Sequence, residues 1–515
     1  MGDSQFLNRH QQTQKCTLPM AKKNSLFLLI QSMSPAEKRY FKLFAKMNQR
    51  NQNYLLLFDA IDSQSEYDET ALKKKLKRHA FVKQLHVTKN YLIKLILKSL
   101  RNFHSQSGKT AEVKDLLRDV EILFQKEQFE LCDELLQKAE KIAGEIELFP
   151  DLLEIFNWQR RLALVCGDAA NSTERVNSLI QKEQDLLKLL SKNNRQWWLA
   201  NNIYDEILSA QQLANGTSVT PPADLLPEKT SESIRVNILF YYNLKTFHFF
   251  TGDLPAAHRA ADSLIEMLTK HPAFVQNDPA ALFTAMNNKV GLCLQSRDYP
   301  SAEKLLATIR EIPKIYGLKH TLRLSPKIWL QTWNMELEMH RDTQNVPGGL
   351  ARAAEIREFL DQLPSDAYPD YRVVLSYQIA YFYFLNQECE TALKWLNGAF
   401  ELDRQTARED LLSYAHFLRL IIHFELENFT VLKYSVESTR RFLKKKRDLH
   451  EFERQLLRFF SKASLAEPAS LPDLIRQLQT SLFDGTDADR QQSVLDYLDF
   501  EQWLNRHLSD NDSQI

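Results

Sequence analysis

The amino-acid sequence predicts an all-α protein. Only 12 of its 515 residues are glycine, far below the roughly 7% that is usual in soluble domains. Leucine, lysine, glutamate and glutamine are abundant, and residues of this kind favour long helices. No segment alternates apolar and polar residues between turn dipeptides, so no strand is expected.

The chain begins with a polar tail and continues as a helical segment. Residues 1–23 are rich in glutamine and lack an apolar period, which predicts a disordered tail. Ser34, Pro35 and Glu37 then match a helix start with a capping box. Further helices are expected at residues 52–62, 69–79 and 87–104. We therefore expect residues 24–107 to form a basic helical N-terminal domain.

The charge of this segment is strongly positive. Residues 1–111 carry a formal charge of +13 and the remainder carries −13, although the whole chain is neutral. Between Thr70 and Ala111 there are 11 lysines and arginines and no acidic residue. Five of these cations are expected to share one exposed face: Lys73, Lys77, Lys94, Lys98 and Arg101. This face could bind a nucleic acid or another polyanion. It could equally bind an acidic protein surface, either of a partner or of the acidic remainder of this chain. The simplest alternative is a solvated surface.

The helix expected at 87–104 also has an apolar side. It is formed by Tyr91, Leu92, Leu95, Ile96 and Leu100. A helix, a connection and a basic helix invite comparison with a helix-turn-helix DNA reader, but the connection "HAFVKQLH" is long for that motif. Because so apolar a helix is suited to packing, we expect the basic face to bind protein in preference to nucleic acid.

The stretch "SQSGKT" (residues 105–110) ends like a phosphate-binding loop. Such a loop needs a strand before it and a glycine five residues before Gly108, where this chain has Phe103. No nucleotide site is therefore expected. The stretch is interpreted as a hinge between the basic segment and the rest of the chain.

Beyond the hinge, one pattern recurs: a short turn, an apolar residue, a proline and then alanine. It occurs in "TGDLPAAHRAADSLIEML" (251–268) and "SRDYPSAEKLLATIREI" (296–312), and without proline in "NQECETALKWLNGAFEL" (386–402). Pro255 and Pro300 fall where the second helix of a pair would begin, a position that tolerates a missing N–H. Ala257, Ala302 and Ala392 are small enough to let two antiparallel helices approach closely.

This pattern resembles the tetratricopeptide-repeat (TPR) family, whose repeats are helix pairs. In "SYQIAYFYFLNQECETALKWLNGAF", the large, small and aromatic positions of the motif hold Ile379, Ala380, Tyr383, Ala392, Leu396 and Ala399. The resemblance covers residues 115–445 and implies a superhelical array of about six or seven helix pairs. It implies pairs at 111–214 and 234–446, a proline-rich loop at 215–233 between them, and C-terminal capping helices at 447–508. The start, "KNSLFLLIQSMSPAEKRYFKLFA", is also similar to that of uncharacterised bacterial repeat proteins of about this length.

The resemblance implies a concave groove that binds a protein or peptide. Aromatic residues stand at the groove positions: Tyr242, Phe249, Tyr377, Tyr381, Phe384, Phe417 and Phe424. Aromatic side chains often anchor interfaces. The alternative is that they pack between successive helix pairs, and the length of the helices favours this alternative.

No catalytic motif occurs in the sequence. His416 and His423 lie two turns apart but lack a carboxylate or thiolate companion, so we expect ordinary packed or surface histidines. The five cysteines are scattered, which favours buried thiols in a cytoplasmic protein. The apolar run "LFLLI" is too short for a signal peptide, so none is expected. We therefore expect a non-catalytic scaffold or adaptor that binds a protein partner, with no cofactor and no metal. The alternative is a nucleic-acid-binding regulator whose repeat array senses a partner.

Overall fold

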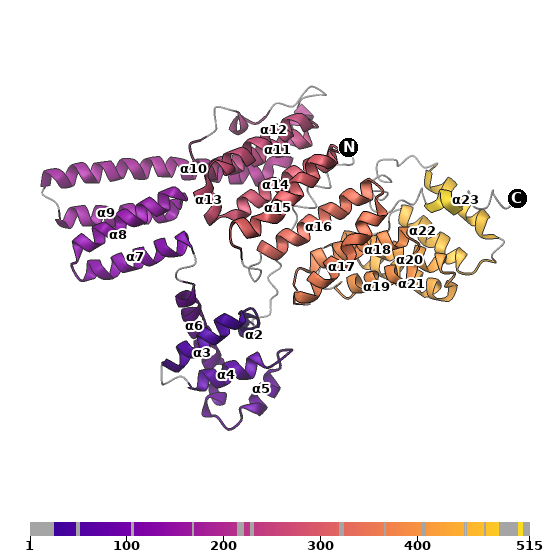
Figure 1. The fold of residues 1–515 in the computed structure, drawn as a ribbon, viewed down its shortest axis with the longest axis horizontal. Coiled ribbons are helices and arrows are strands. Elements are labelled where there is room, and N and C mark those ends of the chain that lie inside the picture. The colour runs from indigo at the N-terminus through magenta and orange to yellow at the C-terminus, as the bar shows by residue number, and fades with distance from the viewer. Residues whose placement is uncertain are drawn as a thin grey trace. The chain divides into compact units, whose positions relative to one another are not determined.

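A computed structural model, drawn in Figure 1, describes residues 25–47, 52–104, 108–166, 169–213, 221–226, 231–318, 324–364, 367–402, 408–446, 449, 451–467, 470–483 and 503–507. Every regular element in these residues is a helix, which confirms the all-α prediction. The chain forms two compact units, the first from residues 17–285 and the second mainly from residues 286–515. The predicted tail at 1–23, much of the proline-rich loop and much of the predicted cap lie outside the described residues.

The first unit opens with a helical segment that has its own hydrophobic core. Its elements are α2 (Ser25–Gln31), α3 (Pro35–Met47), α4 (Gln52–Asp62), α5 (Glu69–Lys75), the 3-10 turn η1 (Ala80–Gln84) and α6 (Leu85–Phe103). The predicted capping box is present, because the Ser34 N–H donates to the Glu37 carboxylate and the Glu37 N–H donates to Ser34 Oγ. The helix expected at 69–79 ends early, at Lys75, and α6 begins two residues before the expected start.

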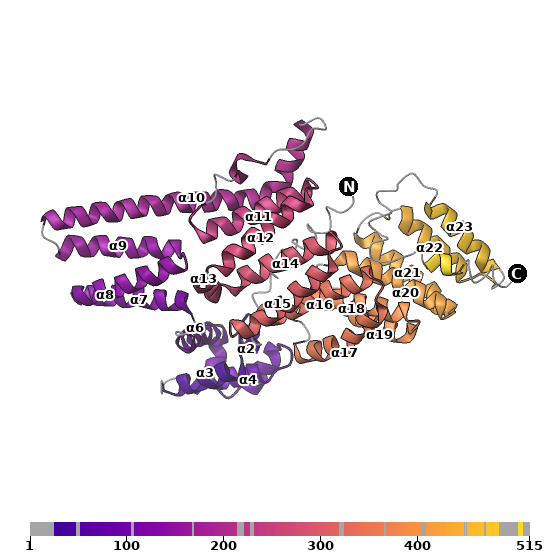
Figure 2. The same cartoon turned by 45° about the horizontal axis from the view of Figure 1, so that its top comes forward.

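Long antiparallel helices follow in the same unit. They are α7 (Lys109–Gln125), α8 (Phe129–Glu145), α9 (Phe149–Cys166), α10 (Ala169–Leu213), the 3-10 turn η2 (Ala223–Leu225), α11 (Ile234–Phe250), α12 (Leu254–Thr269) and α13 (Pro272–Asn277). Helices from α7 to α12 pack on their neighbours in sequence, and the long α10 lies beside both α9 and α11 (Figure 2). The helix α14 (Pro279–Gln295) spans the boundary between the units.

The turn between α8 and α9 also holds the start of α11. The Glu147 carboxylate accepts hydrogen bonds from the N–H groups of Ile234 and Arg235, both at 2.8 Å, and from Ser233 Oγ. The Arg235 guanidinium donates in return to the carbonyl groups of Ile146 and Glu147. These contacts satisfy N–H groups that a helix start leaves without partners.

The second unit contains α15 (Tyr299–Ile315), α16 (Leu324–Asp342), α17 (Val346–Gln362), α18 (Pro369–Leu385), α19 (Cys389–Phe400), α20 (Glu409–Glu425), α21 (Phe429–Lys446), α22 (Glu451–Ala463) and α23 (Leu471–Phe483). Consecutive helices from α15 to α23 pack together. Alternate helices also touch, since α18 contacts both α16 and α20. This arrangement of adjacent pairs is compatible with a helical repeat array.

The same turn joins consecutive helices at seven places in the described residues. Its middle residue has a positive φ of 52–84° and is Glu127, Glu147, Gly252, Arg297, Gln344, Gln387 or Glu427. The next residue donates its N–H back to a carbonyl five positions earlier, for example Asp298 to Cys293 at 2.8 Å. This is the Schellman geometry, which usually places glycine at the left-handed position. Here only Gly252 is glycine, so composition alone does not reveal the repeated turn.

One copy of the recurring pattern was not predicted. In "TQNVPGGLARAAEI" (343–356), Asn345 caps α17 by accepting the Gly348 N–H at 3.0 Å, as Asp253 and Asp298 cap α12 and α15. Pro347 follows at the place of Pro255 and Pro300. The alanine of the pattern is replaced by Gly349, which explains the missed copy between Ala302 and Ala392.

Candidate functional site

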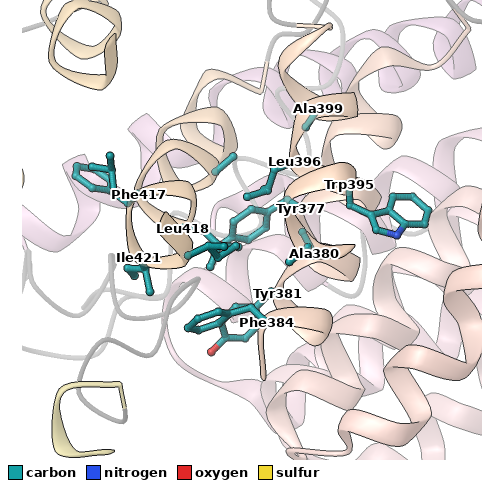
Figure 3. Close-up of a cluster of buried hydrophobic side chains, with 14 of the residues drawn as sticks. Tyr377, Ala380, Tyr381, Phe384, Trp395, Leu396, Ala399, Phe417, Leu418 and Ile421 are labelled. Atoms are coloured by element: carbon teal, nitrogen blue, oxygen red, sulfur yellow. The ribbon is translucent and has the colours of Figure 1, made fainter. Parts of the chain in front are cut away.

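Six of the seven aromatic residues expected to line a groove are buried. Their exposed fractions are 1–8% for Phe249, Tyr377, Tyr381, Phe384, Phe417 and Phe424, and Tyr242 is half-buried. Figure 3 shows Tyr377, Tyr381, Phe384 and Phe417 within a cluster that includes Trp395 and Leu396. The structure therefore places these rings between helices, as the alternative interpretation has it, and not on an open groove.

The reason is the position of α18 within the second unit. All residues from 373 to 382 in this helix are buried, on every side of it. A helix that is covered all round has no face left for a partner. Sequence periodicity could not reveal this, because the neighbouring helices α16 and α20 come from distant parts of the chain.

The buried faces of α15 to α18 also hold polar groups that pair with one another. Gln378 Nε2 donates to Asn334 Oδ1 at 2.7 Å. Glu336, which is 8% exposed, accepts from Arg310 at 2.5 Å and from Arg352 at 2.9 and 3.1 Å. Burial raises the pKa of Glu336, but the two guanidinium groups outweigh burial and leave its pKa below the ordinary value. This carboxylate is thus engaged in joining three helices.

His416 and His423 lie on one side of α20 without a metal-binding partner set. His416 sits between the rings of Phe400 and Phe442, at 4.7 and 4.5 Å, and its Nδ1 is 3.0 Å from Arg419 Nη2. Burial and, secondarily, the charge of Arg419 lower the pKa of His416 to about 3. Across the described parts of the chain, no group of three or more His, Cys, Asp or Glu side chains could hold a metal ion.

A pocket of about 590 Å³ lies between the turn joining α18 to α19, the end of α20 and residues 506–507. Glu425 lines it and accepts from Trp503 Nε1 at 2.5 Å and from His507 Nε2 at 2.6 Å. Burial raises the pKa of Glu425, but the contact with His507 and then that with Trp503 outweigh burial and lower the pKa. Another lining carboxylate, Glu388, accepts from Asn386 at 2.7 Å. Both groups are already engaged by the protein's own side chains.

All five residues of the predicted basic face are exposed. Lys94, Lys98 and Arg101 are spaced by four and three residues, so they follow one line along α6. Lys73 pairs with Glu69 at 2.8 Å, and Lys89 at the start of α6 pairs with the same carboxylate. Glu69 therefore joins α5 to α6.

Three acidic groups of this segment contact basic side chains of the same segment. Asp59 pairs with Lys42, Asp62 pairs with Lys38, and Glu37 contacts His104, at 2.6–2.7 Å. After Glu69, no acidic residue follows until Glu112. Among the exposed lysines and arginines of residues 70–111, seven form neither an ion pair nor a side-chain hydrogen bond with a described residue: Lys74, Lys77, Arg78, Lys83, Lys94, Lys98 and Arg101. We call these seven residues the basic surface.

The apolar side of α6 is used within the segment itself. Leu92 and Ile96 are fully buried in one cluster with Phe41 and Phe58. Tyr91, expected on this side, is instead 49% exposed and stacks on Tyr54 with 4.7 Å between ring centroids. Tyr91 lies at the border of the apolar side, where one step of helical rotation decides exposure.

An exposed apolar stripe on α10 was not predicted. Ile180, Leu187 and Trp198 follow one line along the helix, and Trp197 and Tyr204 follow a second line beside it. Their exposed fractions are 37–53%. The adjacent tryptophans were the available signal, but only the packing of α10 shows which side of the helix stays uncovered. We call these five residues the α10 stripe.

No model of a known protein family matches the sequence, and no curated protein matches it. The TPR resemblance therefore rests on the residue pattern and on the helix pairs. Of the helices that the structure describes, none is both long and apolar enough to cross a membrane.

Proposed function

We propose that this protein is a non-catalytic adaptor whose TPR-like frame of helix pairs holds a surface that binds another protein. The observation that carries the proposal is the α10 stripe. Tryptophan and tyrosine are enriched in protein interfaces and anchor them. From Ile180 to Tyr204 the stripe extends over about 36 Å, which matches a partner helix laid along α10.

The polar residues beside the stripe support the same function. Most of them carry no charge: Gln184, Ser191, Asn194 and Asn201 are exposed on this side of α10. Depletion of charge is typical of the centre of an interface. The proposed surface thus replaces the expected concave groove, for which six of the seven predicted aromatic residues are buried.

Quantitative affinity capture tests the proposal. The bait is the full-length protein, compared with a Trp197→Ser/Trp198→Ser double variant and with a Tyr434→Ser control. Tyr434 is 72% exposed on α21, a helix whose described residues include no other tryptophan or tyrosine, so the control removes an exposed ring elsewhere. We expect the double variant alone to lose its specific partners while keeping the parental melting temperature. Retention of all partners by the double variant would contradict the proposal.

The nucleic-acid-binding alternative has an observation of its own, the basic surface. It does not compete with the first function, because the basic surface and the α10 stripe involve different helices.

A further inference from the structure

We infer that the basic surface binds the phosphate backbone of duplex nucleic acid. This activity is separate from the protein binding proposed for α10. It rests on three features of the segment: unpaired exposed cations, an apolar side that is already covered, and the absence of acidic residues between Thr70 and Ala111.

The first step concerns what α6 leaves exposed. A protein partner was expected because the helix is so apolar, but Leu92 and Ile96 are covered by residues of α3 and α4. The exposed side of α6 holds a line of three cations, Lys94, Lys98 and Arg101, together with Val87, Tyr91 and Leu97, which are 45–51% exposed. The large apolar side that favoured a protein partner is thus occupied within the segment itself.

The second step concerns spacing and charge. From Lys94 to Arg101 the helix rises about 10 Å, so three cations stand on one rigid edge. A duplex carries one negative charge for about every 1.7 Å of its axis, so each cation can meet a phosphate. Lys77 and Lys83, which precede α6, add further exposed positive charge. No carboxylate of residues 70–111 opposes the approach of a polyanion.

The third step separates duplexes from single strands. Proteins that bind single strands stack successive bases on exposed aromatic rings. The aromatic ring on this line of α6 is Tyr91, and Tyr54 already covers one of its sides. Phosphate contacts carry no sequence information, so we expect binding without sequence preference.

Fluorescence anisotropy of the full-length protein with a labelled random-sequence DNA duplex tests the inference. Five engaged cations predict a log–log salt slope of about −4 to −5, which is a loss of affinity of about 250- to 1,000-fold between 50 and 200 mM salt. Lys94→Gln/Lys98→Gln should reduce the magnitude of the slope by about 2. The matched control is Lys188→Gln/Lys192→Gln, which also removes two exposed lysines four residues apart, on α10, and should leave the slope unchanged.

Three further arms assign the ligand. The affinity for an RNA duplex, compared with that for the DNA duplex, shows which of the two the surface prefers, and either preference agrees with the inference. Tighter binding of a single strand would overturn the duplex assignment. Poly-glutamate that displaces the duplex at equal charge concentration would show a surface for acidic protein instead. An unchanged slope in the Lys94→Gln/Lys98→Gln variant, with an unchanged circular dichroism melting curve, would also overturn the inference.

Discussion

Gly349→Ala tests whether the pair formed by α16 and α17 obeys the same packing rule as its neighbours. Four residues after the cap, the second helix of a pair carries a small buried residue: Ala257, Ala302 and Ala392 are 0% exposed. At Gly349 even a methyl group is too large. A Cβ added there would lie 2.6 Å from three ring atoms of Phe382.

The size of the effect follows from two opposing contributions. Carbon atoms rest about 3.5–4.0 Å apart, so the added methyl overlaps the ring by about 1 Å. Phe382 is 1% exposed and cannot swing into solvent. Overpacking costs about 1–3 kcal/mol, whereas replacing glycine by alanine inside a helix gains about 1 kcal/mol. Because three ring atoms are involved, we expect a net destabilisation of about 1–2 kcal/mol.

Gly398→Ala is the matched control. This glycine lies in α19, and an added Cβ would meet nothing within 4 Å. The control should therefore stabilise the protein by about 0.5–1 kcal/mol through backbone entropy. Urea unfolding followed by circular dichroism measures both variants.

A second substitution identifies the cause. Phe382→Leu in the Gly349→Ala background removes the overlapping ring atoms, so the two changes should couple by about 1 kcal/mol in a double-mutant cycle. The reasoning is refuted if Gly349→Ala stabilises the protein as much as Gly398→Ala does, or if the two changes are additive.

Three other substitutions test the core. Leu396→Asp places a charge at a fully buried position and should lower the free energy of unfolding by about 3–5 kcal/mol, measured in urea, whereas Asn397→Asp at an exposed position should change it little. Equal stability of the two variants would show that Leu396 does not face the core. Burial lowers the pKa of Lys245 to about 8 from 10.5, so Lys245→Met should raise the free energy of unfolding by about 2–3 kcal/mol at pH 7. This gain should shrink as pH rises from 8 to 10.5, and an equal gain at pH 7 and pH 10 would contradict the reasoning. The lowered pKa of His416 means that, below pH 6.5, the unfolded chain gains a proton that the folded chain does not. Stability is therefore lost as pH falls from 6.5 towards 3, by about 2 kcal/mol at pH 5, and His416→Gln should abolish this part of the pH dependence in parallel urea titrations.

Sequence reasoning succeeded where local chemistry decides the structure. The capping box at Ser34 and the helix starts at Pro255 and Pro300 depend on residues within one turn, and the structure has all of them. The exposure of Lys94 and Lys98 follows from helical spacing in the same way.

It failed where distant segments decide. Tyr377 is recognisably helical from its neighbours, but its burial depends on α16 and α20, which no local pattern describes. The copy at Gly349 was not predicted because the recurring pattern was defined by an alanine. At this position Phe382 leaves no room for the methyl group of alanine, so glycine replaces it. The α10 stripe was missed for a related reason, since the uncovered side of a helix is known only once its neighbours are placed.

The helix pairs give the α10 stripe a rigid support. An isolated helix frays at its ends, and most helical stability in proteins comes from packing. The first half of α10 packs through Leu179 and Leu186 into a cluster with α7, α8 and α9, and its second half packs through Leu199 onto α11. Asn243 of α11 donates to the carbonyl and side-chain oxygens of Gln196, both at 2.9 Å. A partner that binds the α10 stripe therefore meets a preordered helix, and the complex loses little conformational entropy on this side of the interface.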